Sequence, residues 1–157
     1  MTSFTTCFTV DQTPEAAFCA INNVRGWWSK AIDGPTDTAG GTFDYHFQDI
    51  HRCKIQVSEL IPGKRIVWHV LDNYFSFTED ETEWTGTTIV FTISRTGGGT
   101  EVRFTHEGLV PEYECYDACS DGWSTYISGS LRALIETGKG DPNLGDPMTG
   151  TERALAG

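Results

Sequence analysis

His106 is the side chain in this sequence with the clearest potential for chemistry. Val102, Phe104 and His106 alternate with polar residues, and this two-residue period places the imidazole on the apolar face of a predicted strand. A neutral imidazole in an apolar cavity could orient a ligand oxygen or transfer a proton near neutral pH. The alternative is a structural histidine that is hydrogen-bonded to a helix and fixes how sheet and helix pack.

Catalysis by His106 would require a second titratable group on the same inner face. Tyr45 is the candidate, because the carboxylates gather in residues 79–83 and on the outer face of the last predicted strand. His106 and Tyr45 are therefore weak catalytic candidates, as an acid and base pair. The sequence has no Gly-Lys-Ser/Thr phosphate loop, and Gly97-Gly98-Gly99 fits a hairpin turn, so neither ATP hydrolysis nor a cofactor is expected.

The cysteine pattern argues against metal binding and disulfides. The five cysteines are an odd number without short repeated spacings, which fits neither a disulfide framework nor a zinc ribbon. Cys115 and Cys119 could share a helix face, but no second pair completes a metal site. We expect reduced, packed thiols in a cytoplasmic protein and no metal.

The charge of the chain limits its partners. Eleven basic against twenty-two acidic side chains give a net charge of −11, which repels nucleic-acid phosphates and anionic lipids. No stretch approaches about eighteen apolar residues, and the N-terminal segment lacks a basic start followed by an apolar run. We therefore expect a cytoplasmic location, with neither nucleic acid nor membrane as a partner.

The pattern of apolar residues predicts an α+β order of elements. A strand over residues 4–10 precedes two short helices, the first starting at Thr13-Pro14-Glu15 and the second carrying Trp27 and Trp28, one in the core and one at its rim. Five further strands are predicted at residues 43–47, 53–58, 65–70, 87–94 and 102–107. A long helix over about 112–137 follows.

The chain reads as one domain with a short C-terminal extension. Residues 1–138 contain all of the predicted elements, and Gly138 supplies a helix stop. Residues 139–157 are rich in Gly and Pro and poor in apolar residues, which predicts a flexible tail.

The inward faces of these elements are rich in aromatic rings. Flat rings suit a pocket for a flat or elongated apolar ligand, whereas the alternative is a packed core that the rings fill themselves. The predicted ligand-binding side chains are Trp27, Trp28, Phe43, Tyr45, Phe47, Trp68, Phe91, Phe104, His106, Trp123, Ile127 and Leu131.

Six short motifs occur in a characteristic order along residues 4–138. They are Thr13-Pro14-Glu15-Ala16-Ala17-Phe18, Trp27-Trp28, Pro62-Gly63-Lys64-Arg65-Ile66-Val67-Trp68, Gly98-Gly99-Thr100-Glu101-Val102, Thr105-His106-Glu107-Gly108 and Gly122-Trp123. In this order they resemble the SRPBCC superfamily, which includes START and birch-pollen-allergen-like proteins. Within it, the chain is similar to bacterial homologues of the C-terminal domain of the activator of the ninety-kilodalton heat-shock chaperone's ATPase.

The resemblance implies a helix-grip fold: a curved antiparallel sheet of about six strands around a long C-terminal helix, with two short helices after the first strand. It implies a cavity for a hydrophobic small molecule between sheet and helix. Two alternatives remain open: a cyclase- or hydrolase-type enzyme using the cavity, and a protein that docks on a chaperone or another partner. For docking, the candidate contact is the acidic set Glu79, Asp80, Glu81 and Glu83. The chain is expected to be a monomer or a homodimer.

Overall fold

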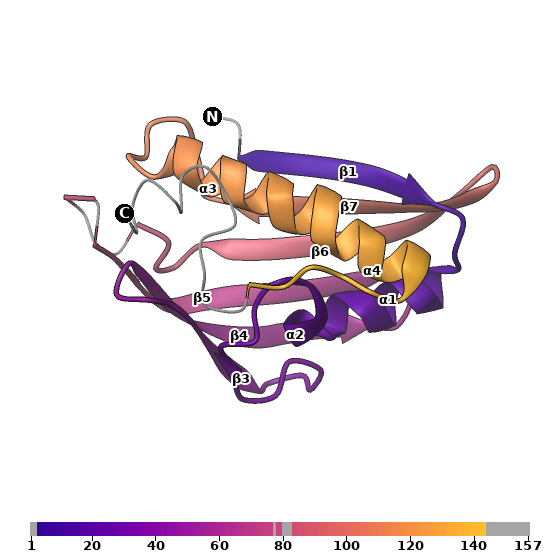
Figure 1. The fold of residues 1–157 in the computed structure, drawn as a ribbon, viewed down its shortest axis with the longest axis horizontal. Helices are drawn as coiled ribbons and strands as arrows, with labels where there is room; N and C mark the ends of the chain where they lie inside the picture. The colour runs from indigo at the N-terminus through magenta and orange to yellow at the C-terminus, as the bar shows by residue number, and fades with distance from the viewer. Residues whose placement is uncertain (1–2, 77, 80–82, 144–157) are drawn as a thin grey trace.

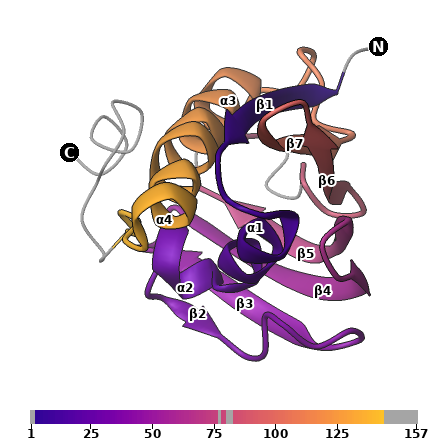
Figure 2. The same cartoon turned by 90° about the vertical axis from the view of Figure 1, so that its right-hand side faces the viewer.

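The structure has two layers, a curved sheet and a set of helices on its concave face. The computed structural model describes residues 3–76, 78–79 and 83–143. Figure 1 shows the long C-terminal helix lying across the sheet, and Figure 2 shows the two short helices on the same side. The predicted α+β helix-grip fold is therefore confirmed.

The sheet is antiparallel throughout and has seven strands in the order β1-β7-β6-β5-β4-β3-β2. The strands are β1 (Phe4–Val10), β2 (Ile32–Asp33), β3 (Thr42–Phe47), β4 (His51–Ile61), β5 (Arg65–Phe75), β6 (Thr88–Thr96) and β7 (Gly99–Glu107). The expected number of about six was one too low. The additional strand, β2, is only two residues long, so it carries no period that a sequence could reveal.

The two short helices follow β1 as predicted. They are α1 (Pro14–Asn22) and α2 (Val24–Trp27). The Thr13 side chain accepts a hydrogen bond of 3.1 Å from the backbone N–H of Ala16, and Pro14 stands at the first helical position. Both features match the N-terminal signal in the sequence. The Thr13 side chain satisfies one of the free N–H groups at the helix start, and Pro14 has no N–H that would need a partner.

The long helix is wound differently from the regular helix expected over residues 112–137. It consists of α3 (Tyr116–Trp123), a π-helical segment η1 (Ser124–Leu131) and α4 (Arg132–Thr137). Trp123, Ile127, Leu131 and Ile135 are all buried and lie four residues apart. In a regular α-helix such a series drifts by about 40° per step, away from the sheet. The looser π-helical turns offset that drift and keep the series facing the core.

Residues 140–143 cross the seam between α2 and η1. The backbone of Asn143 exchanges hydrogen bonds with Lys30 N–H (3.0 Å) and Trp28 C=O (2.8 Å), and the Asn143 side chain is bonded to the Tyr126 hydroxyl at 3.2 Å. The Asp141 N–H donates to Ser130 Oγ at 2.7 Å. The described start of the predicted flexible tail is thus packed, while residues 144–157 lie outside the described residues and the domain boundary at residue 138 stays a prediction.

Candidate functional site

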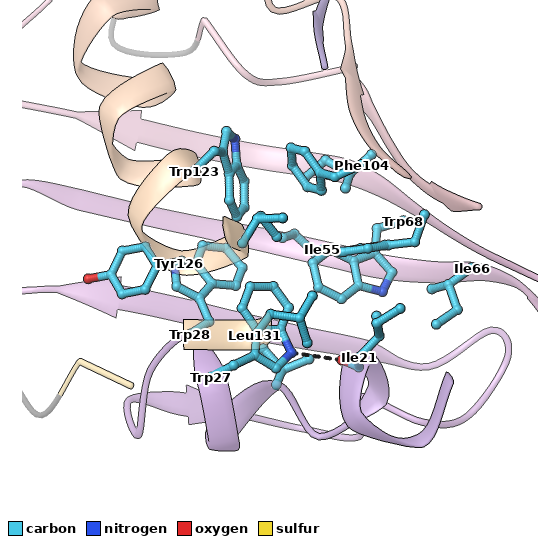
Figure 3. Close-up of a cluster of buried hydrophobic side chains, with 14 of the residues drawn as sticks. Ile21, Trp27, Trp28, Ile55, Ile66, Trp68, Phe104, Trp123, Tyr126 and Leu131 are labelled. Carbon is cyan, nitrogen blue, oxygen red and sulfur yellow. Dashed lines mark hydrogen bonds between the residues drawn. The ribbon is translucent and has the colours of Figure 1, made fainter. Parts of the chain in front are cut away.

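Every predicted ligand-binding side chain is buried, and Tyr45 and Phe47 are the most exposed of them at 3%. Trp27 and Trp28 are both in the core, so the expectation that one lies at the rim was wrong. The helix α2 ends at Trp27, and Trp28 lies directly after it, followed by the buried Ser29, which pairs with Asn143. The side chains come from α2, β3, β5, β6, β7, α3 and η1, and they converge between sheet and helix (Figure 3).

Aromatic rings stack on one another through this interior. Trp28 lies against Tyr45 with ring centroids 4.2 Å apart and meets Trp123 at 5.0 Å. Trp27 and Trp68 stack at 6.2 Å, and the Trp27 indole N–H donates to the Ile21 carbonyl at 3.0 Å, the dashed line in Figure 3. The described rings thus occupy much of the space in which the sequence placed a ligand.

His106 is fully buried and hydrogen-bonded through both ring nitrogens. The Trp123 indole can only donate, and it donates to His106 Nδ1 at 3.1 Å, so Nδ1 carries no proton. Nε2 therefore holds the proton and donates to Thr87 Oγ1 at 2.8 Å. The Thr87 hydroxyl in turn donates to the Trp84 carbonyl. These contacts assign the tautomer of a neutral imidazole.

Burial favours the neutral form of this histidine. Loss of hydration, with a smaller contribution from His51, lowers the pKa of His106 to about 3. Ring contacts connect Tyr45 to His106 indirectly, through Trp28 and Trp123 and also through His51 and Trp84. None of the described hydrogen bonds joins His106 to Tyr45, and the arrangement corresponds to the structural alternative for His106.

His51, at the start of β4, is a further inner-face residue that the sequence reasoning missed. Its Nε2 lies 3.0 Å from Asn73 Oδ1, and its ring contacts Tyr45, Phe75 and Trp84 with centroids 5.1, 4.4 and 4.6 Å away. Burial among these rings lowers the pKa of His51 to about 3. The signal was present, because the inward alternation of Cys53 and Ile55 extends back by two residues to His51.

Trp84 is the second residue that was missed. It belongs to a turn over residues 83–86, yet its side chain is only 3% exposed. The indole stacks on Trp123 at 5.5 Å with an interplanar angle of 11°, and its ring meets His106 at 4.7 Å and Phe75 at 5.5 Å. A residue in a turn has no periodic pattern, so the only signal was a large apolar side chain beside an acidic loop.

Glu83 turns inward and caps the long helix. Its Oε2 and Oε1 accept hydrogen bonds from the backbone N–H groups of Glu114 (3.0 Å) and Cys115 (3.1 Å), and Glu83 is only 9% exposed. In return, the Glu114 carboxylate accepts from the N–H of Glu79 at 3.0 Å. The prediction that Glu83 is a surface contact for a partner was therefore wrong, because its carboxylate is engaged by two backbone N–H groups of the turn that leads into α3. Asp80 and Glu81 lie outside the described residues.

The thiols carry no metal site in the described ranges. All five cysteines are free, with Cys53, Cys115 and Cys119 buried. Burial first, and then contact with Cys115, raises the pKa of Cys119, so the thiol stays protonated at neutral pH. Residues 3–76, 78–79 and 83–143 contain no group of three or more His, Cys, Asp or Glu side chains suited to a metal ion.

Two grooves open on the described surface. One, of about 330 Å³, runs over the outer face of β3, β4 and β5 and is lined by charged residues such as Asp44, Arg52 and Asp72. The other, of about 280 Å³, lies between α1 and residues 35–37 and includes Asn22 and Arg25. The second groove is mostly polar and does not suit an apolar ligand, whereas the surface of the first is more apolar than polar and its lining includes Tyr45 and Tyr74.

The fold and the aromatic interior define a helix-grip protein of the SRPBCC type. The sequence model of the family described as "Activator of Hsp90 ATPase homolog 1-like protein" matches residues 16–136. The match spans most of the chain, and the protein belongs to this family.

Solved structures support the same fold. The Aha1 dimer from Colwellia psychrerythraea is 26% identical with a TM-score of 0.71, and the match covers 89% of this chain and 100% of that one. CalU16 from Micromonospora echinospora is 16% identical with a TM-score of 0.63, over 96% of this chain and 80% of that one. DynU16, from the dynemicin biosynthetic locus, is 17% identical with a TM-score of 0.65, over 88% of this chain and half (50%) of that one.

The remaining comparisons add two observations. No curated protein sequence matches the chain significantly. Within the described residues, no helix has both the length and the apolar character needed to span a membrane.

Proposed function

We propose that this chain is a cytoplasmic binding protein that holds a flat apolar or aromatic small molecule between the curved sheet and the long helix. The observation that carries the proposal is the inner lining, which is built of stacked indole and phenyl rings from both layers. Planar rings offer a large apolar contact area with few torsions to immobilise, which suits a planar guest. The cytoplasmic location is part of the proposal, and it rests on the odd number of cysteines, which is not typical of a disulfide framework.

The chemistry of the lining favours binding over catalysis. His106 uses both ring nitrogens within the protein, so neither is free to exchange a proton with a substrate. Low imidazole pKa values keep His51 and His106 neutral, and the lining therefore offers no positive charge to an anionic ligand. The residues act by excluding water and by stacking.

The test is native mass spectrometry of freshly purified protein, followed by thermal shift with a panel of uncharged polycyclic aromatic compounds. We expect a retained or added small molecule and a raised melting temperature. Phe91→Leu, on the inner face, should weaken binding at least severalfold, while Thr92→Ser, the next residue along β6 and facing outward, should not. Absence of any adduct and of any thermal shift across the panel would contradict the proposal.

The family match favours a second candidate function, which is stimulation of a chaperone ATPase. The family description names the activator of the Hsp90 ATPase, and the chain is similar to the Aha1 of C. psychrerythraea along most of its length. The direct test is the ATP hydrolysis rate of purified Hsp90 with and without this chain at two salt concentrations. A salt-sensitive rise in rate would support docking through surface charge, and an unchanged rate would exclude it.

We also propose a homodimer as the assembly. The C. psychrerythraea relative is a dimer, and in this sheet the strands β1 and β2 stand at the two edges with one side unpaired by the rest of the sheet. Light scattering coupled to size exclusion should give twice the chain mass of 17.4 kDa. A mass equal to one chain at micromolar concentration would contradict this assembly.

A further inference from the structure

We infer that the space filled by the Trp84 indole is a binding site for a planar, uncharged bicyclic aromatic compound, which takes the place of that side chain. This inference rests on the proposed function and names where and what the protein binds. It follows from three properties of Trp84: its attachment to the backbone, the walls around its ring and its hydrogen bonding.

The attachment of Trp84 differs from that of three of the other four tryptophans. Trp27 belongs to α2, Trp68 to the middle of the sheet and Trp123 to α3, whereas Trp84 belongs to a turn. Trp28 also lies in a turn, but its backbone is tied to α2 and to Asn143. The backbone of that turn is held independently of the ring. The Trp84 carbonyl accepts from the Thr87 N–H at 2.9 Å, and the Gly86 N–H donates to the Val70 carbonyl at 2.9 Å. The indole can therefore leave by rotation about its side-chain torsions without breaking a strand pair or a helical turn.

The walls around the ring are fixed by contacts that do not involve it. The Trp123 ring, stacked on the Trp84 ring at 5.5 Å, is oriented by its own hydrogen bond to His106. His51 is held by Asn73, and its ring stands edge-on to the Trp84 ring with an interplanar angle of 88°. A slot with one stacking wall, Trp123, and three edge-on walls, His51, Phe75 and His106, remains when the indole rotates out. Its shape selects a flat guest of two fused rings.

The hydrogen bonding of Trp84 lowers the cost of the exchange, while burial of the guest's rings must offset the exposure of the indole. Its Nε1–H has no partner of regular hydrogen-bond geometry among the described residues, although the Cys119 thiol lies near enough to interact with it. A buried donor without a good acceptor loses its hydration uncompensated, and rotation into water restores that hydration. A guest without a buried donor, or with one that the thiol accepts well, fills the slot at lower cost.

The charge of the slot excludes anions. Both flanking imidazoles are neutral, and the Glu83 carboxyl group, one residue from Trp84, is buried at the start of α3. A carboxylate on the guest would be desolvated beside an acidic side chain and two neutral imidazoles. The expected guest is neutral.

The first experiment follows Trp84 in the whole wild-type chain labelled with 5-fluorotryptophan. Five ¹⁹F resonances are expected, and Trp84→Phe identifies the one from Trp84. We expect 2-naphthol to move the Trp84 resonance to a solvent-exposed position that a soluble nitroxide broadens. The four other resonances should stay protected. The anion 2-naphthoate, of the same ring size, should leave all five unchanged.

The second experiment compares affinities by isothermal titration. Trp84→Ala removes the competing indole, so it should bind 2-naphthol at least about tenfold more tightly than the wild type. Trp68→Ala removes an equal volume from the middle of the sheet and should gain no such affinity. If Trp84→Ala does not fold, the fluorine measurement on the wild type still shows whether the Trp84 indole leaves its site when 2-naphthol binds.

The outcomes separate this inference from the proposed function. Binding of 2-naphthol with the Trp84 resonance still protected would overturn the exchange while leaving a binding protein. Equal gains in affinity for Trp84→Ala and Trp68→Ala would also overturn it, because 2-naphthol would then bind any cavity left by a removed indole. No binding of 2-naphthol to the wild type or to Trp84→Ala overturns the site, whereas the proposed function fails only if the wider panel and native mass spectrometry are also negative.

Discussion

The imidazole of His106 illustrates how one buried polar group joins the two layers of the fold. It accepts from Trp123 on the helix and donates to Thr87 directly before β6, so the sheet and the helix share one hydrogen-bonded chain. A two-residue alternation predicted that the side chain faces inward, because the pleat of a strand fixes its direction. The partners could not be predicted, since Thr87 and Trp123 are distant in sequence and meet only in the packed structure.

The neutral state of His106 makes the stability of the fold depend on pH. The unfolded chain takes up a proton below the ordinary imidazole pKa of 6.5, whereas the folded chain resists it until about pH 3. The unfolded state therefore binds more protons in this window, and the free energy of unfolding falls as pH falls through it, by about 1.4 kcal/mol per pH unit for one histidine.

We expect His106→Gln to flatten this dependence. Between pH 7 and pH 5, the wild type should lose about 2 kcal/mol more than the variant, because only the region below the ordinary pKa contributes. Urea unfolding at pH 7, 6 and 5 measures the difference, and the shared carboxylates cancel in the comparison. Parallel curves for the two proteins would show that the folded-state pKa of His106 is not depressed.

At the scale of single elements, the long helix departs most from its sequence pattern. Its apolar series with steps of four was recognisable, but the compensation of its drift by π-helical winding was not, because the same spacing also fits a slightly curved α-helix. The start was placed at residue 112 although the helix begins at Tyr116. A carboxylate from another part of the chain, Glu83, binds the turn immediately before that start, and the local sequence of the helix does not indicate this contact.

The two hydrogen bonds that Glu83 accepts before the helix should contribute to the unfolding free energy of the chain. Glu83→Ala leaves the backbone N–H groups of Glu114 and Cys115 without their acceptors, which should cost about 1–3 kcal/mol of unfolding free energy. Glu79→Ala removes an exposed carboxylate of the same segment and is the control, with an expected change within about 0.5 kcal/mol. Equal losses in the two variants would assign the effect to net charge instead of capping.

A substitution at Gly122, in the same helix, should stabilise the chain instead of destabilising it. A Cβ added at Gly122 meets no heavy atom within 4 Å, and the residue does not adopt a positive φ. Gly122→Ala should therefore stabilise the chain by about 0.5–1 kcal/mol through helix propensity, raising the melting temperature by about 1–4 °C. Calorimetry against the wild type checks this, and a lower melting temperature would mean that the glycine serves a close contact.

At the scale of the whole molecule, the aromatic interior is enclosed on the side of α2 by a segment that the sequence classed as tail. Composition was misleading here, because Gly and Pro are common in flexible termini and also where two backbone segments pass close to each other. A Cβ on Gly140 would stand 2.3 Å from the Gly26 carbonyl oxygen, so the glycine is required for the chain to pass close to α2. The segment then fastens the backbone of Trp28, whose ring lies at the centre of the stack.

Two truncations should separate this packed segment from the residues that follow it. Ending the chain after Asn143 keeps the hydrogen bonds to Lys30, Trp28, Tyr126 and Ser130, and we propose that it lowers the melting temperature by no more than about 2 °C. Ending it after Lys139 removes those four bonds at about 0.5–1.5 kcal/mol each and should lower the melting temperature by about 5–10 °C. Near-ultraviolet circular dichroism, dominated by the buried tryptophans, should weaken in the shorter chain alone. A fall above about 10 °C on the first truncation would instead place residues 144–157 within the packed structure and move the domain boundary to the end of the chain.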